Sequence, residues 1–166
     1  MSQVITPPAY PPISGPLIFL AGPIQGTEPW QAQAAALIHA AAPQIVVANP
    51  RRPRLKEGEQ IYAEQVDWER HHLRMAGVQG VVLFWLAREI THHCDRAYAQ
   101  TSRFELAEWK VRHERDGAQL ALGIDEGFSG ARYIQRRFAQ DCPSVPIWPS
   151  LAATCAHAVA LCHNCV

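Results

Sequence analysis

The sequence predicts an α/β domain in which a five-stranded parallel sheet carries helices on both faces. Short apolar runs alternate with longer helical segments five times along the chain, and the intervals between the runs are too long for β-hairpins. Parallel strands need such crossover segments, which cover the two faces of the sheet. Apolar residues make up 48% of the 166 residues, enough for one core. We therefore expect one domain over residues 17–166, preceded by a loose, proline-rich lead-in over residues 1–16.

Strands are predicted where runs of β-branched and other apolar residues stop at glycine, proline or a polar residue. Residues 78–86 give the strongest signal, and the first run stops at Gly22. The last run contains Pro146, which has no N–H to donate and is typical of an edge strand. The predicted strands cover residues 17–21, 45–48, 78–86, 120–123 and 145–148.

Helices are predicted where apolar residues recur at helical spacing between capping and breaking residues. Pro43 ends the first helix and Gly117 the third, while Ser150 caps the last. The predicted helices cover residues 30–42, 61–76, 101–115, 131–140 and a final segment from 150 onward. Between them lie a charged loop over residues 51–58 and a long polar loop over residues 87–100.

The charge balance favours a small-molecule partner. Lys plus Arg and Asp plus Glu both number 15, so the basic footprint of a nucleic-acid-binding protein is missing. We find neither a secretory signal nor an apolar run near the roughly 18–20 residues that cross a bilayer. We expect a cytoplasmic protein with reduced thiols, and no interaction with nucleic-acid polymers or membranes. The Cys-x-x-Cys of residues 162–165 lacks a second pair, so we expect neither a metal nor a cofactor.

Three segments are expected to meet at one edge of the sheet, because ligands of such folds bind beyond the carboxyl ends of the strands. These segments are residues 22–24, 49–52 and 86–105. Arg51 and Arg52 could hold a phosphate or stack on a base, or could be solvated. Trp85, at a strand end, could stack on a base or pack in the core.

Glu105 is the main candidate for a catalytic carboxylate. It falls at the third or fourth position of a helix that starts near Thr101 or Ser102. The positive end of the helix dipole would keep the carboxylate ionised, as a nucleophile requires. The same spacing also fits a capping box, in which Glu105 would only satisfy the start of its own helix. On the preceding helix, an inward-facing Asp67 would need a charged or hydrogen-bonding partner, or a functional role, to offset the cost of burial. Trp68 is expected either in the core or against a ligand.

Five segments, taken in order, resemble the nucleoside 2-deoxyribosyltransferase-like family. The likeness runs from about Phe19 to Trp109, with a looser continuation through residues 130–133. The segments are Phe19-Leu20-Ala21-Gly22-Pro23-Ile24, Asn49-Pro50-Arg51-Arg52, Gln65-Val66-Asp67-Trp68-Glu69, Val82-Leu83-Phe84-Trp85 and Thr101-Ser102-Arg103-Phe104-Glu105-Leu106-Ala107-Glu108-Trp109.

The resemblance implies a three-layer, flavodoxin-like or Rossmann-like fold and cleavage or transfer of the N-glycosidic bond of a nucleoside or nucleoside 5′-monophosphate. It implies that Glu105 attacks the sugar to form a glycosyl-enzyme intermediate, and that Asp67 holds the sugar or the base. The departing base also needs a proton. The candidates for its donor are Asp67, His92, His93 and Asp95.

The resemblance further implies a homo-oligomer and a substrate pocket built from the strand ends. The expected substrate-binding residues are Phe19, Gly22, Pro23, Ile24, Asn49, Arg51, Trp68, Trp85, Asp95, Ser102 and Arg103. Three positions depart from the family pattern: Phe19 replaces a tyrosine that orients the nucleophile, Ala99 replaces an aspartate, and Ala76-Gly77 replaces an Ala-Asp pair. These departures favour hydrolysis, or a different base or sugar, over the transfer reaction. Phe19 and Ala99 also leave a non-catalytic nucleotide-binding module as the alternative.

Overall fold

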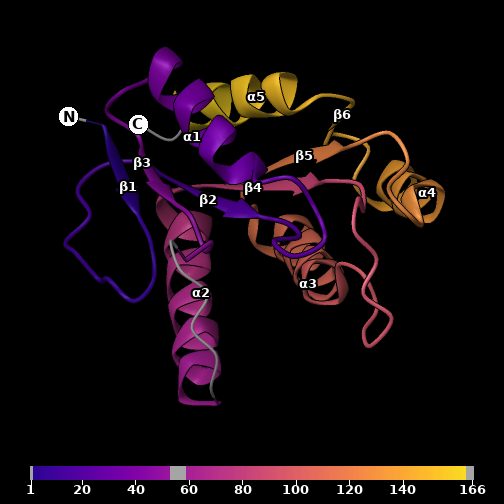
Figure 1. The fold of residues 1–166 in the computed structure, drawn as a ribbon. Coiled ribbons are helices and arrows are strands. Elements are labelled where there is room, and N and C mark those ends of the chain that lie inside the picture. The colour runs from indigo at the N-terminus through magenta and orange to yellow at the C-terminus, as the bar shows by residue number, and fades with distance from the viewer. Residues whose placement is uncertain (1, 53–58, 164–166) are drawn as a thin grey trace.

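The computed structural model describes residues 2–52 and 59–163, and it has the predicted α/β architecture. A parallel sheet of strand order β1-β3-β2-β4-β5-β6 carries helices on both faces (Figure 1). The part of this order from β3 to β6 is that of flavodoxin-like sheets. In such sheets the strand that follows the first one is added on one side of it, and the later strands are added on the other side. None of the described helices is long and apolar enough to cross a membrane.

The sheet has six strands, so the prediction of five was wrong. The additional strand, β1, covers Gln3–Ile5 in the lead-in and pairs with β3 at the edge of the sheet. The Ile5 side chain is buried, and the Ile5 carbonyl accepts a hydrogen bond of 2.8 Å from the Asn49 amide. A three-residue strand followed by a proline-rich segment is too short to show a periodicity that a sequence pattern could reveal. The other strands are β2 (Leu17–Ala21), β3 (Val46–Ala48), β4 (Gly80–Leu86), β5 (Leu120–Ile124) and β6 (Ile147–Trp148).

The five helices in the described part of the chain follow the predicted order, and the largest shift of a boundary is at the end of the second helix. The second helix continues to Gln79, and its neighbour Val78, predicted to be in a strand, is 90% exposed in the last turn. The strand starts instead at Gly80, where any side chain would overlap the Leu17 backbone. The helices are α1 (Trp30–Ala41), α2 (Glu59–Gln79), α3 (Gln100–Asp116), α4 (Ala131–Asp141) and α5 (Leu151–His163).

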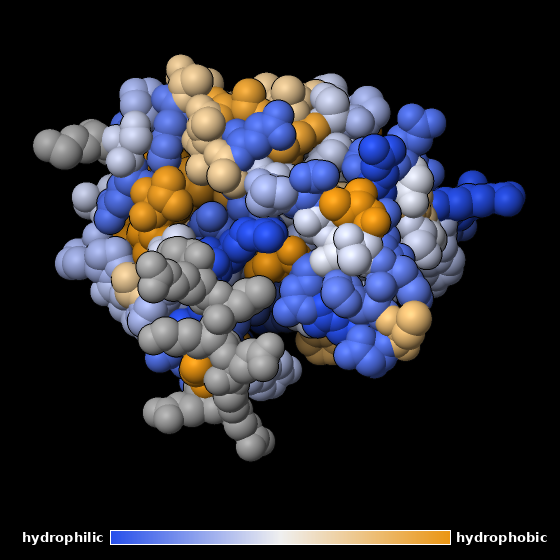
Figure 2. All heavy atoms as spheres, viewed as in Figure 1, coloured by the Kyte–Doolittle hydropathy of each residue, from blue (hydrophilic) through white to orange (hydrophobic). Residues whose placement is uncertain are grey.

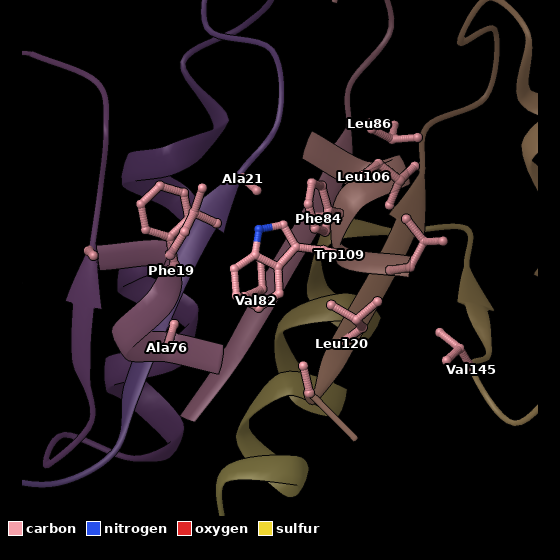
Figure 3. Packing of buried hydrophobic residues seen from close by; sticks show 14 of the residues in the cluster. Phe19, Ala21, Ala76, Val82, Phe84, Leu86, Leu106, Trp109, Leu120 and Val145 are labelled. Carbon is pink, nitrogen blue, oxygen red and sulfur yellow. The ribbon is translucent and has the colours of Figure 1, made fainter. Parts of the chain in front are cut away.

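Each face of the sheet has its own core. Helices α2, α3 and α4 cover one face, where Trp68 packs against Phe19. Trp109 belongs to the same cluster, together with strand residues such as Val82 and Phe84 (Figure 3). Helices α1 and α5 cover the other face with smaller side chains and the buried Trp30 (Figure 1). Most of the charged loop predicted for residues 51–58, and the end of the Cys-x-x-Cys tail, lie outside the described residues.

The three segments expected to form a site follow adjacent strands. Strands β3, β2 and β4 are neighbours in the sheet and run parallel. Their carboxyl ends, at Ala48, Ala21 and Leu86, therefore lie at the same edge. Because α2 follows β3 and α3 follows β4, the two helices stand side by side below this edge (Figure 1).

Candidate active site

A cleft of about 550 Å³ opens at this edge, between α2, α3 and the strand-end loops. In the view of Figure 2 a hollow lies between α2 and α3, with hydrophilic and hydrophobic side chains at its rim. Both polar and apolar groups line it, as in sites for small molecules. The lining residues include Phe19, Gly22, Pro23, Ile24, Arg52, Gln65, Glu69, His93, Arg96, Tyr98, Ser102 and Glu105.

Glu105 reaches the cleft from the second turn of α3. The helix begins at Gln100, earlier than predicted, so the expectation of a first-turn position was wrong. Ala99 precedes the helix in a left-handed conformation, with φ of 55°, and no side chain caps the N-terminus. Glu105 is half-buried and accepts no hydrogen bond from any residue that the structure describes. The capping-box alternative is therefore wrong, and the Glu105 carboxyl is free for another role.

The sequence predicted an environment that keeps the Glu105 carboxylate ionised, whereas the structure places it where its pKa is raised. Burial raises the pKa of Glu105 to about 8, and the negative charges of Glu69 and Glu108 add to the rise. Because the residue is in the second turn, the helix dipole, which acts mainly within the first turn, does not offset the lost hydration. In the empty cleft at neutral pH, the protonated form of Glu105 therefore predominates.

Glu69, on α2, lines the same cleft as Glu105. Burial raises its pKa, while a hydrogen bond from Gln65 and the positive charge of Arg52 oppose that rise. The Gln65 amide nitrogen donates to the Glu69 carboxylate at 2.8 Å. Glu69 thus has partners that stabilise its charge, and Glu105 has none among the described residues. The two carboxyl groups line one cleft, and the negative charge of Glu69 is one of the causes that raise the pKa of Glu105.

Hydrogen bonds hold the strand-end loops in place. The Pro23 carbonyl accepts from the indole of Trp30 at 2.9 Å and from the amide of Gln31 at 3.3 Å. Arg51 donates to the Ile24 carbonyl at 2.9 Å, so it braces the loop and does not line the cleft. The Asn49 side chain accepts from the Arg51 amide at 2.9 Å and likewise lies behind the lining.

Gly22 allows the backbone to pass close to a neighbouring strand. A side chain at Gly22 would come within 2.2 Å of the Trp85 carbonyl oxygen, and φ is +150°. The small residue expected to admit a ligand therefore also satisfies a packing need of the sheet.

The loop between β4 and α3 covers one side of the cleft. Tyr98 donates a hydrogen bond of 2.7 Å to the Ala87 carbonyl, and the Gly26 carbonyl accepts from the amides of Ile90 and Thr91. His93 and Arg96 line the cleft from this loop. Asp95 is exposed and His92 pairs with Glu89 at 2.9 Å, and neither belongs to the lining.

Several residues predicted for the site lie elsewhere. Asp67 is exposed and lines a separate, shallow groove on α2, beside Tyr10 and Arg70. The structure therefore does not bring Asp67 to Glu105, because Trp68 occupies the inward direction and Asp67 and Glu69 lie on opposite sides of it.

Trp68, Trp85 and Arg103 do not line the cleft, and they make contacts that stabilise the fold. Trp68 is fully buried, packs against Phe19 and donates to the Ala9 carbonyl at 2.8 Å. Trp85 belongs to the core on the α1 and α5 face. Arg103 donates to the Ser129 carbonyl and lies over the Phe128 ring at 4.5 Å.

Sequence reasoning missed Glu69, Gln65 and Tyr98. A signal was available for the first two, since residues 65 and 69 are four apart and share a helix face beside Trp68. No sequence pattern indicated Tyr98, whose position depends on the course of the loop.

Ser102 is the most enclosed polar group of the lining. It is only 5% exposed, and its hydroxyl has no hydrogen-bond partner among the described residues. The amides of Gln100, Thr101 and Ser102 precede the first internal hydrogen bond of α3, which runs from the Arg103 amide to the Ala99 carbonyl at 3.0 Å. Together these donors give the N-terminus of α3 a preference for negatively charged groups.

The fold and the cleft together define a class of protein. Its members are flavodoxin-like α/β domains in which two acidic side chains, here Glu69 and Glu105, line a cleft at the C-terminal ends of the central strands. The family model described as nucleoside 2-deoxyribosyltransferase like matches residues 15–116. Since the match covers more than half of the 166 residues, the chain belongs to this family. No match was found among curated proteins.

Proposed function

We propose that this protein cleaves the N-glycosidic bond of a nucleoside or nucleotide, with Glu105 as the nucleophile. The observation that carries the proposal is the pairing of Glu105 with Glu69 in one cleft, with no structural partner for Glu105 among the described residues. Family membership supports glycosyl transfer as the general chemistry. Two carboxyl groups with different environments are also the arrangement that retaining glycosidases use on C–O bonds.

The chemistry needs one carboxylate and one proton, and the pair holds both. In the first step the proton that Glu105 holds passes to Glu69, the ionised Glu105 forms a bond to the anomeric carbon, the bond from that carbon to the base nitrogen breaks, and the base leaves with the same proton from Glu69. In the second step water, or a second base, attacks the anomeric carbon and loses a proton to Glu69, while the ester to Glu105 breaks. Proton donation of this kind contributes about 10²–10⁴-fold to the rate. In this proposal Glu69 takes the role for which the sequence offered four candidates, Asp67, His92, His93 and Asp95.

The donors at the start of α3 favour a substrate with a phosphate group. Arg52 is committed to Glu64 and Gln65, and Arg51 and Arg103 hold backbone carbonyls. Among the described lining residues, an anion could be held by the Ser102 hydroxyl, Arg96, His93 and the first-turn amides of α3. We therefore propose a nucleoside 5′-monophosphate, and not a free nucleoside, as the preferred substrate.

The alternative is a module that binds a nucleotide without turnover. Phe19 favours this alternative, because it has no hydroxyl to orient the Glu105 carboxylate. We also propose a homo-oligomer, since Tyr62 and Phe104 expose 71% and 75% of their surface on α2 and α3. Its mass in solution is measured by light scattering.

Product analysis tests the proposal. The protein is incubated with nucleosides and their 5′-monophosphates, with and without a second base. Release of free base and sugar supports hydrolysis, and base exchange supports transfer. Saturable binding without either product supports the non-catalytic module and overturns the enzymatic proposal.

A further inference from the structure

The side-chain amide of Gln65 has a partner at each of its polar atoms. The nitrogen donates to the Pro50 carbonyl and to Glu69 Oε1, both at 2.8 Å, and the oxygen accepts from Arg52 Nε at 2.8 Å. A flipped amide would set its oxygen against two acceptors and its nitrogen against a donor. The orientation of Gln65 is therefore fixed by its neighbours.

Gln65 links the loop after β3 to the cleft. Arg52 also pairs with Glu64, one residue before Gln65 on α2, and its side chain is only 13% exposed. The Arg52 guanidinium thus holds the oxygen of Gln65, and the nitrogen of Gln65 holds Glu69. Arg52 acts on Glu69 through this contact as well as through its charge.

We propose that Gln65 is a positioning residue that fixes the Glu69 carboxyl group, so that Oε2 alone exchanges a proton with Glu105 and the substrate. Oε1 accepts the hydrogen bond from Gln65, and this bond makes protonation of Oε1 less favourable than protonation of Oε2. The inference rests on the proposed function, in which Glu69 transfers the proton of the carboxyl pair.

The contact also sets the pH range in which the pair holds a single proton. A donor to Glu69 stabilises the ionised form, so it lowers the pKa of Glu69 and delays the second protonation of the pair as the pH falls. Without Gln65, the acidic limb of the activity profile moves to higher pH, toward the basic limb. Among the described residues, the charged or titratable groups that line the cleft or act on the pair are Arg52, Tyr62, Glu89, His93, Arg96, Tyr98 and Glu108, and Glu64 pairs with Arg52.

The first test compares Q65M with wild type and with the control Q79M. Met keeps the length of the side chain and removes the amide, and Gln79 is a glutamine at the far end of α2 whose amide donates at 3.5 Å to the Gly15 carbonyl. We expect Q65M to lower kcat about 10- to 100-fold with KM within about threefold, and to move the acidic limb up by about one pH unit. Q79M is expected to match wild type. Q65N, which keeps the amide on a shorter side chain, is expected to behave like Q65M.

A role for Gln65 that is only structural would lower activity at every pH without moving the acidic limb, and this result would overturn the inference. So would a loss confined to KM. If Q65M does not fold, Q65N supplies the same comparison.

A second measurement separates this inference from the proposed function. The side-chain carboxyl ¹³C signals of wild type and Q65M are followed through a pH titration, with E69Q and E105Q used for assignment. A Glu69 pKa about one unit higher in Q65M supports the positioning role even if no substrate is turned over, in which case only the proposed function fails. An unchanged Glu69 pKa overturns the positioning role whether or not the wild type is active.

Discussion

Helices α3 and α5 both follow the carboxyl end of a strand, yet they begin in different ways. At α5, the Ser150 hydroxyl accepts a hydrogen bond of 3.2 Å from the Ala153 amide, as the sequence predicts. At α3, Ala99 precedes the helix in a left-handed conformation and no side chain caps it. Capping satisfies orphan amides and stabilises a helix.

The difference agrees with a structural role for the start of α5 and with the ligand-binding role proposed for the start of α3. The Ser150 hydroxyl satisfies an amide of α5, whereas Gln100, Thr101, Ser102 and Glu105 line the cleft and no side chain among the described residues caps α3. A left-handed alanine also carries a cost of order 1 kcal/mol. We infer that α3 gives up local stability for ligand contacts, and four experiments test this contrast.

The largest expected effect is that of Glu105→Gln on turnover. Removing the nucleophile is expected to lower kcat at least about 10³-fold, because no covalent intermediate can form. The melting temperature should stay within a few degrees, since Glu105 caps nothing. The control is Glu114→Gln near the end of the same helix, where Glu114 pairs with Lys110 at 3.0 Å. Retained turnover in Glu105→Gln would mean that the start of α3 is not catalytic.

The second effect is on the pH dependence of stability. The folded-state pKa of Glu105 is about 8, above its usual value of 4.5. The folded state therefore binds more protons than the unfolded state between these values, and the free energy of unfolding falls as the pH rises from about 5 to 8. We expect this residue to contribute a loss on the order of a few kcal/mol. Denaturant unfolding at pH 5 and pH 8 measures it.

Glu105→Gln removes this titration and should flatten the profile. The variant is then as stable as wild type at pH 5 and more stable at pH 8. An equal fall in both proteins would show that Glu105 ionises freely in the folded state.

The third effect concerns the ligand that the uncapped end accepts. Ser102→Ala removes an enclosed hydroxyl that has no partner among the described residues, so stability should hold or rise slightly. The affinity for a 5′-monophosphate should fall about 10- to 100-fold, as expected for a lost hydrogen bond to a charged group. Titration calorimetry with a 5′-monophosphate and with the corresponding nucleoside measures the two affinities. Equal losses for the two ligands would place the phosphate elsewhere.

The sequence was sufficient for the fold because its signals are repeated along the chain. Strands such as β2 and β4 are apolar throughout, and each is followed by a segment of clear helical type. The edge strand β1 was not predicted because three residues are too few to show an alternating pattern. Its pairing depends on the exposed edge of β3, which is a property of the assembled sheet.

The site was predicted in outline and not in detail. The sequence places Glu105 and the strand ends at one edge, but the choice between Asp67 and Glu69 depends on which way Trp68 faces. The start of α3 depends on a left-handed Ala99, which the residue type does not favour. The pKa of Glu105 depends on its burial beside Glu69, and no local sequence pattern reports this.

The smallest expected effect is that of Ser150→Ala at the capped end. Loss of the hydroxyl leaves the Ala153 amide without its partner, and the free energy of unfolding should fall by about 0.5–2 kcal/mol. Turnover should not change, because α5 packs on the face of the sheet opposite the carboxyl pair. Thr101→Ala in the first turn of α3 is the matched change at the uncapped end, and it should leave stability unaltered. If Thr101→Ala destabilised the protein as much as Ser150→Ala, the start of α3 would be capped in solution, and its donors would not be free for a ligand.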